Sequence, residues 1–244
     1  MEKKIVLYTH PQSRGRNVVW MLEECGAKYD TVLLNFGDDL HSPEYLAINP
    51  MGKLPALKYG DTVITETAAI ITFLADVFPK AQLAPALSDA KRGEYYRWLF
   101  YTVNSVEAAL MEVAFQFPIQ PAMRKTLGYG SMERVIDTLD GQLRQHPYLL
   151  GEQFQSCDLV LAGLLMFAIK SKALTPTDAM QAYLARITAR SAFQKMNDIS
   201  AAQFDAIKCL NLCHCKPCKN RQAQANQPPA PCFAWHPIQT PSTA

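Results

Sequence analysis

The stretch that decides the fold is "GKLPALKYGDTVITETAAIITFLAD", residues 52–76. Within it, "PALKY" and "TVIT" have the composition of short strands, and the Gly60-Asp61 pair between them is typical of a hairpin turn. The residues that follow repeat with a helical period, which places one apolar face on Ala69, Ile70, Phe73, Leu74 and Val77. The stretch therefore predicts a hairpin followed by a helix.

Polar groups gather where this helix begins. Glu66 and Thr67 occupy its first turn, whose free N–H groups favour an anion. The Thr67 hydroxyl can donate to a carboxylate, and Glu66 can accept from an ammonium group. Across the hairpin, Pro55 leaves the backbone of Leu54 free to pair with something other than the sheet. Together these features predict a receptor for a small zwitterionic peptide.

Each feature also has a purely structural interpretation. Thr65 or Thr67 can cap the helix, Glu66 can offset the helix dipole, and Pro55 can mark an edge strand. It is their joint occurrence at this spacing that favours a binding site.

The residues before this stretch alternate between strand and helix patterns. "KKIVLYTH" predicts a strand, "RGRNVVWMLEECG" a helix closed by Gly26, and "KYDTVLLNF" a second strand. "SPEYLAI" predicts a short helix capped by Ser42. This alternation indicates an α/β layer.

A different pattern begins after the Pro-containing linker "PKAQLAPAL". From Ser88 to Asp205 nearly every segment has a helical period. We expect one long helix over 89–115, then helices near 131–145, 156–170 and 177–189 and a short one near 191–197. The sequence therefore predicts a helical bundle attached to the α/β layer.

The last region, 206–244, has no Gly, six of the sixteen Pro and five of the seven Cys. We expect a disordered tail. Within it lies a cluster formed by Cys209, Cys213, His214, Cys215 and Cys218, whose thiolates would suit zinc or copper(I). Because the spacing is not a well-attested zinc pattern, we expect no metal.

Charge and hydropathy exclude several functions. The first 205 residues carry 20 basic and 22 acidic groups, which gives no reason to expect nucleic-acid binding. The longest apolar run, 159–169, is too short to cross a bilayer, and we expect a buried helix with no membrane role. The N-terminus lacks the apolar core of a signal peptide, so we expect a cytoplasmic protein.

The run "NPMGKLPAL" followed by "ETAAIITFLAD" resembles the glutathione-binding half of cytosolic glutathione transferases, and residues 3–205 follow their two-domain plan. The resemblance implies an α/β thioredoxin-like N-terminal domain, 1–80, and an all-α C-terminal helical bundle domain, 88–205. It also implies a homodimer. One departure is Gln155, which holds the place of a hydroxyl capping residue before Asp158 and leaves Ser156 as a substitute cap.

The resemblance also implies which residues bind glutathione. Glu66 and Thr67 would bind its γ-glutamyl end, and the backbone of Leu54, before a cis Pro55, would pair with its cysteinyl part. Lys53 and His41 would contact the glycine carboxylate.

The chemistry is expected in the first loop, "YTHPQSRGRNVVW". A free thiol has a pKa of about 8.5, and lowering it by ~2 units requires about 2.7 kcal/mol of preferential stabilisation of the thiolate. We expect the Ser13 hydroxyl, at a helix N-terminus, to supply much of this. Gln12 or Arg14 can take the thiolate-facing place instead. The loop has no Cys, which disfavours a reductase that works through a protein thiol.

We therefore expect a detoxifying glutathione transferase that joins the glutathione thiolate to a hydrophobic electrophile held by the helical domain. Candidates to line that pocket are Tyr101, Asn104, Ser105, Phe115 and Phe117, although helical aromatic stripes are more often core. Two alternatives stay open: a glutathione-dependent disulfide reductase or peroxidase without a protein Cys, and a glutathione-binding module without catalysis.

Overall fold

The computed structural model describes residues 3–212. Its first part is a four-stranded mixed sheet in the order β2-β1-β3-β4. Strands β1 and β2 pair in parallel, whereas β1 with β3 and β3 with β4 pair antiparallel. The strands are β1 Ile5–Thr9, β2 Asp30–Leu33, β3 Ala56–Tyr59 and β4 Thr62–Thr65. This is the thioredoxin-like layer that the sequence predicts, with β3 and β4 forming the expected hairpin.

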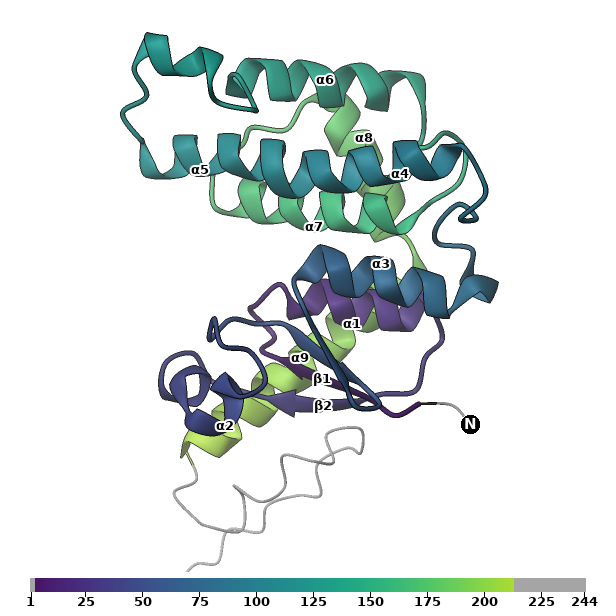
Figure 1. Ribbon diagram of the computed structural model, residues 1–244, viewed down its shortest axis with the longest axis vertical. Coiled ribbons are helices and arrows are strands. Elements are labelled where there is room, and N and C mark those ends of the chain that lie inside the picture. The colour runs from purple at the N-terminus through teal and green to yellow at the C-terminus, as the bar shows by residue number, and fades with distance from the viewer. Residues whose placement is uncertain (1–2, 213–244) are drawn as a thin grey trace, which may run out of the picture.

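Two helices cover one face of this sheet. Helices α1 (Gly15–Glu24) and α3 (Thr67–Val77) lie between the sheet and the helical region (Figure 1). Two short elements, η1 (Asp38–His41) and α2 (Pro43–Leu46), lie within the connection between β2 and β3. The predicted cap of α2 is confirmed, because the Ser42 hydroxyl accepts from the N–H of Tyr45 at 3.2 Å.

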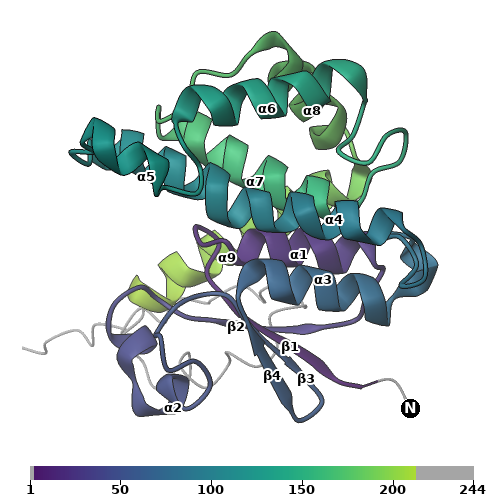
Figure 2. The same ribbon diagram turned by 45° about the horizontal axis from the view of Figure 1, so that its top comes forward.

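The helical region stacks on α1 and α3 (Figure 2). The single long helix expected over 89–115 is continuous but contains a π-helical segment, η3, between α4 and α5. The remaining elements agree with the predicted positions, apart from two short 3-10 segments. The bounds are η2 Pro79–Ala81, α4 Lys91–Phe100, η3 Tyr101–Val106, α5 Glu107–Phe115, η4 Pro121–Lys125, α6 Met132–Gln145, α7 Ser156–Lys170 and α8 Asp178–Thr188.

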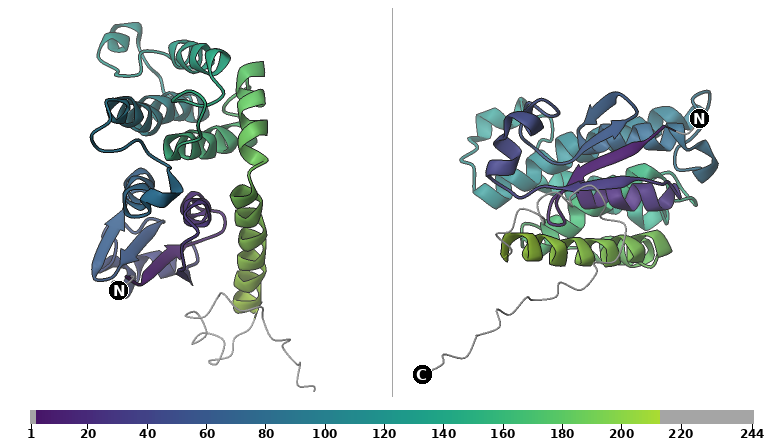
Figure 3. Two further views of the ribbon diagram at one scale, coloured as in Figure 1. Left: turned by 90° about the vertical axis from the view of Figure 1, so that its right-hand side faces the viewer. Right: turned by 90° about the horizontal axis from the view of Figure 1, so that it is seen from below.

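Helix α9 spans Ser191–Leu212 and is much longer than the expected 191–197. It leaves the bundle and runs alongside α1 (Figure 3), where the ion pairs Arg190–Glu24 (2.7 Å) and Lys195–Glu23 (2.5 Å) connect it to the first domain. The region predicted as a tail therefore begins inside this helix. Residues 213–244, with most of the Cys cluster, lie outside the described residues.

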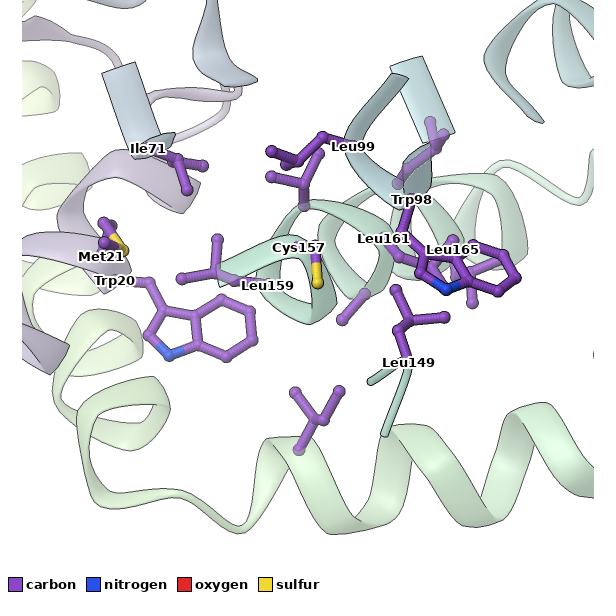
Figure 4. Close-up of a cluster of buried hydrophobic side chains, with 14 of the residues drawn as sticks. Trp20, Met21, Ile71, Trp98, Leu99, Leu149, Cys157, Leu159, Leu161 and Leu165 are labelled. Carbon is purple, nitrogen blue, oxygen red and sulfur yellow. The ribbon is translucent and has the colours of Figure 1, made fainter. Parts of the chain in front are cut away.

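The core is continuous across the two parts of the fold. Trp20 and Met21 of α1 and Ile71 of α3 meet Leu159 of α7 and its buried neighbours (Figure 4). Helix α7, the longest apolar run of the sequence, is buried as predicted. Among residues 3–212, no helix has both the length and the apolar character needed to span a membrane.

The start of α7 is held by a buried carboxylate. Asp158, fully buried, accepts from the N–H of Leu149 and of Gln155, both at 2.8 Å, and from the Tyr183 hydroxyl at 3.0 Å. The expectation that Ser156 replaces the missing hydroxyl cap is wrong, because its hydroxyl pairs with Tyr95 at 2.6 Å instead. The Asp158 carboxylate therefore ties the connection before α7 to the start of the helix.

Candidate active site

Three segments meet at one edge of the sheet because of its register. Ala56 at the start of β3 lies opposite Tyr8 of β1 and opposite Thr65 of β4. The residues just before Ala56 must therefore lie beside the loop that leaves β1 and beside the start of α3. The predicted site residues in these three segments are close in space although they are far apart in the sequence.

The first segment presents an unpaired piece of backbone. The Leu54–Pro55 peptide bond is cis, as the resemblance implies. The carbonyl of Lys53 is fixed by the Tyr45 hydroxyl (2.6 Å) and by Asn49 Nδ2 (2.7 Å). The N–H and C=O of Leu54 have no hydrogen-bond partner within residues 3–212. This backbone is available to pair with an extended peptide.

The second segment is the start of α3. Glu66 is exposed and has φ 68°, in the positive region that side-chain-bearing residues rarely adopt. Such a conformation costs about 1–3 kcal/mol and tends to persist where function requires it. No side chain caps the helix, so capping by Thr65 or Thr67 is not what the structure shows. The first N–H groups of α3 remain available for an anion.

The third segment is the loop with Ser13. Its hydroxyl donates to the carbonyl of His10 at 2.8 Å and accepts from the N–H of Gly15 at 3.0 Å and of His10 at 3.3 Å. Ser13 therefore organises the turn before α1, but the N-cap residue of that helix is Arg14. To donate to a thiolate, the Ser13 hydroxyl must turn away from the His10 carbonyl.

The two alternatives to Ser13 have their own partners. The Arg14 guanidinium makes a two-point ion pair with Glu107 of α5, at 2.5 and 3.0 Å. The Gln12 side chain is exposed, and the backbone N–H of Gln12 donates to His10 Nδ1 at 3.1 Å. Burial lowers the pKa of His10, which favours the neutral imidazole that this bond requires.

The last two predicted residues lie on the loops before β3. His41 Nδ1 lies 2.8 Å from the carbonyl of Gly37, and a Cβ placed on Gly52 would be 3.9 Å from His41 Cδ2. His41 is therefore beside the residue that precedes Lys53, and both side chains are exposed. The structure brings them to one side of the Leu54 backbone.

A cavity of about 510 Å³ separates the first loop from the helical region. Ser13, Arg14 and Thr67 are part of its wall on the sheet side. The opposite wall comes from η3, α5, α7 and the start of α9, with the lining residues Thr102, Val103, Glu107, Val160, Gly163, Leu164, Met166, Phe167, Lys170, Ser171, Phe193 and Met196. The volume suits a small organic molecule.

The expected lining of this cavity is wrong in detail. Tyr101, Asn104, Ser105, Phe115 and Phe117 do not line it. The π-helical segment η3 has a wider turn than the α-helix assumed from the sequence, so it changes which side chains face inward. Phe115 and Phe117 stack on each other at 5.7 Å at the exposed end of α5.

Further cavity residues were missed because they carry no motif. Arg16 and Asn17 belong to the first turn of α1, and Lys170 ends a helix whose apolar run predicts only burial. Their position depends on how α7 and α9 pack on α1, which a helical period does not reveal.

A second, open hollow of about 650 Å³ lies elsewhere, where β1 and β2 meet α9. Charged side chains such as Lys3, Lys28 and Lys195 line it, and it contains none of the predicted site residues. Within residues 3–212 there is no group of three or more His, Cys, Asp or Glu side chains arranged to hold a metal ion.

A thioredoxin-like domain with an unpaired backbone beside a cis proline, joined to a helical domain across a cavity, defines a two-domain protein with a binding site for an extended peptide. The comparisons identify the family. The family model described as the N-terminal domain of glutathione S-transferase matches residues 14–77. Glutathione S-transferase 1 of Zea mays is 31% identical over 158 residues, which covers 60% of this chain and 73% of that protein.

Two other similar proteins are informative. The disulfide-bond oxidoreductase YghU of Escherichia coli is 29% identical over 169 residues, covering 64% of this chain and 58% of that protein. A glutathione transferase family member from Pseudomonas fluorescens, solved with two glutathione molecules bound, has a TM-score of 0.66 and 27% identity, covering 79% of this chain and 92% of that one. The chain belongs to the cytosolic glutathione S-transferase family and is an enzyme of that family.

Proposed function

We propose that this glutathione S-transferase joins the thiolate of glutathione to the electrophilic carbon of a hydrophobic molecule. The observation that carries the proposal is the position of the first loop. Ser13, at the start of α1, faces a cavity whose other wall is largely apolar and comes from the helical region. A thiolate beside Ser13 would therefore meet an electrophile bound against α7.

Glutathione would lie along the sheet edge, and the site residues supply a partner for each of its parts. The N–H and C=O of Leu54, before Pro55, would pair with the cysteinyl backbone. Glu66 would accept from the γ-glutamyl ammonium, and Thr67 with the free N–H groups of α3 would hold the adjoining carboxylate. Lys53 and His41 would contact the glycine carboxylate. The Pseudomonas relative with bound glutathione supports the choice of this peptide.

The thiolate would be stabilised by Ser13 and by the positive end of α1. On binding, the thiol proton would go to solvent, and the Ser13 hydroxyl would turn from the His10 carbonyl to the sulfur. The exchange is favourable because a hydrogen bond to a charged group contributes about 1.5–3 kcal/mol, against about 0.5–1.5 for the neutral bond that is lost. The thiolate then forms a C–S bond, and the electron pair of the bond that breaks leaves with the leaving group.

Glutathione-dependent disulfide reduction is the second candidate. Its support is the similarity to the oxidoreductase YghU. The first loop has no Cys, so glutathione itself would have to supply both electrons.

Product analysis separates the two candidates. The protein is incubated with glutathione and 1-chloro-2,4-dinitrobenzene, and separately with glutathione and 2-hydroxyethyl disulfide. Detection of the aryl thioether of glutathione by mass spectrometry would support conjugation. If glutathione disulfide forms with 2-hydroxyethyl disulfide and no thioether forms with 1-chloro-2,4-dinitrobenzene, the proposed conjugation is wrong and disulfide reduction takes its place.

We propose that residues 1–80 form the glutathione-binding domain and 88–205 the domain for the electrophile, in a cytoplasmic detoxifying homodimer. Exposed apolar side chains on β4 and α4 support self-association: Val63 is 39% exposed and Phe100 is 69% exposed. Sedimentation velocity of the intact protein and of the Phe100→Asp variant tests the homodimer. The carboxylate introduced at position 100 should shift the variant toward monomer.

A further inference from the structure

Two cations in the cavity have no role in the proposed mechanism. Arg16 lies in the first turn of α1 and Lys170 ends α7, and both line the same cavity as Ser13. Neither makes an ion pair with a carboxylate within residues 3–212. The one carboxylate on the cavity wall, Glu107, already pairs with Arg14. The cavity therefore has surplus positive charge.

Arg16 is the more informative of the two. One of its terminal nitrogens donates to Asn197 Oδ1 of α9 at 2.8 Å, which holds the side chain in place. Its Nε is buried and has no acceptor in the described part of the chain. Burial without a counter-charge also lowers the pKa of this guanidinium. A guanidinium on the cavity wall without a counter-charge favours an anionic ligand.

A third polar residue, Thr102, belongs to the wall of the same cavity. Thr102, in the π-helical segment η3, is fully buried, and its hydroxyl has no partner among the described residues. Because its hydroxyl is closed off from the cavity, Thr102 adds polar character to this wall without itself reaching a ligand. Between these polar groups the wall is apolar, with Val160, Leu164, Met166, Phe167, Phe193 and Met196.

We propose that the electrophile is an organic acid whose apolar body packs against α7 and α9 and whose carboxylate or sulfonate binds Arg16. The proposal rests on the proposed conjugation and names its substrate class. Lys170 adds positive charge from the opposite, α7 side of the same cavity. Glutathione occupies the sheet edge beside Leu54 and Glu66, so its own carboxylates have other partners.

Binding is measured first, because it does not depend on turnover. Calorimetry compares 3,5-dinitrobenzoate with 3,5-dinitrobenzamide, which differ in charge, on the intact protein saturated with S-methylglutathione. We expect the acid to bind about tenfold or more tightly than the amide, the effect of one charge-assisted hydrogen bond. Arg16→Gln should remove this preference and Arg16→Lys should keep part of it.

The matched control is Arg134→Gln, since Arg134 is an exposed arginine of α6 outside the cavity. It removes the same charge from the protein and should leave the preference unchanged. Thermal unfolding shows whether each variant is folded, and Arg16→Lys supplies the test if Arg16→Gln does not fold.

Conjugation is measured next with 4-chloro-3,5-dinitrobenzoate and its amide, each rate divided by the uncatalysed rate. Glutathione sulfur bonds to the ring carbon that carries chlorine, and chloride leaves with the electron pair. Arg16→Gln should raise KM for the acid by the factor seen in binding, while kcat and the KM of the amide change little.

Equal affinity for acid and amide would overturn the proposal. So would an Arg16→Gln variant that binds S-methylglutathione more weakly while still preferring the acid, because Arg16 would then belong to the glutathione site. Failure of the proposed function has a different signature: the acid is preferred through Arg16, yet neither chloro compound is conjugated.

Discussion

Replacing Ser13 by Ala should raise the pKa of the glutathione thiol when it is bound. The Ser13 hydroxyl can donate one hydrogen bond, and in the free protein it donates this bond to the His10 carbonyl at 2.8 Å. On binding, the hydroxyl would donate its hydrogen bond to the sulfur instead, and only the difference between the two hydrogen bonds stabilises the thiolate.

That difference sets the magnitude. A bond to a charged group contributes about 1.5–3 kcal/mol and a neutral one about 0.5–1.5, so the net gain is roughly 1–1.5 kcal/mol. Because about 1.4 kcal/mol corresponds to one pKa unit, Ser13→Ala should raise the pKa of the bound thiol by about one unit. The remaining depression would come from the end of α1.

The assay is ultraviolet absorbance of the thiolate of bound glutathione against pH. Ser88→Ala, at an exposed serine of the linker, is the control and should not change the titration. Ser13→Ala also removes the acceptor for the Gly15 N–H, so thermal unfolding accompanies the titration. An unchanged thiol pKa in Ser13→Ala, with a raised one in Arg14→Gln, would refute the role of the hydroxyl and favour charge pairing by Arg14.

Three further predictions follow from single contacts. Glu66→Gly should raise the thermal midpoint, because glycine tolerates φ 68°, yet weaken glutathione binding about tenfold or more in calorimetry; unchanged affinity would remove Glu66 from the site. Gly15→Ala should destabilise by about 1–3 kcal/mol in urea unfolding, because the new Cβ would lie 1.9 Å from Thr9 Oγ1, whereas Gly93→Ala in α4 meets nothing within 4 Å and should be neutral or stabilising. Burial raises the pKa of Asp158 to about 6, so the folded state binds this proton more tightly than the unfolded one, and the free energy of unfolding should fall as pH rises from about 4 to 6, by at most about 1.4 kcal/mol per pH unit. Asp158→Asn should flatten that slope, and an equal slope in both proteins would contradict the assignment.

The fold could be predicted from the sequence because its signals are local. The Gly60-Asp61 turn and the helical pattern of α3 depend on neighbouring residues, and the hairpin and the helix are confirmed, although Ala69 of the predicted apolar face is exposed. Helix α9 was underestimated because its apolar face is sparse and its length depends on packing against α1 and on ion pairs such as Arg190–Glu24.

The site could be predicted only in part. The sheet register brings Leu54, Ser13 and Glu66 together, and local features with the family resemblance were enough to name them as candidates. The residues of the cavity wall could not be predicted in this way. Its polar residues, Arg16 and Thr102, are placed by the packing of α7 and α9 and by the π-helical turn, which leave no pattern in the sequence.

The most direct test of the central claim is a crystal structure of the protein with S-hexylglutathione. We predict that the peptide pairs with the Leu54 backbone and that its γ-glutamyl end lies at Glu66 and Thr67. Its sulfur should lie beside Ser13, with the hexyl chain in the cavity against α7. A peptide bound in the hollow between β1, β2 and α9, or a sulfur turned away from Ser13 and the cavity, would contradict the central claim.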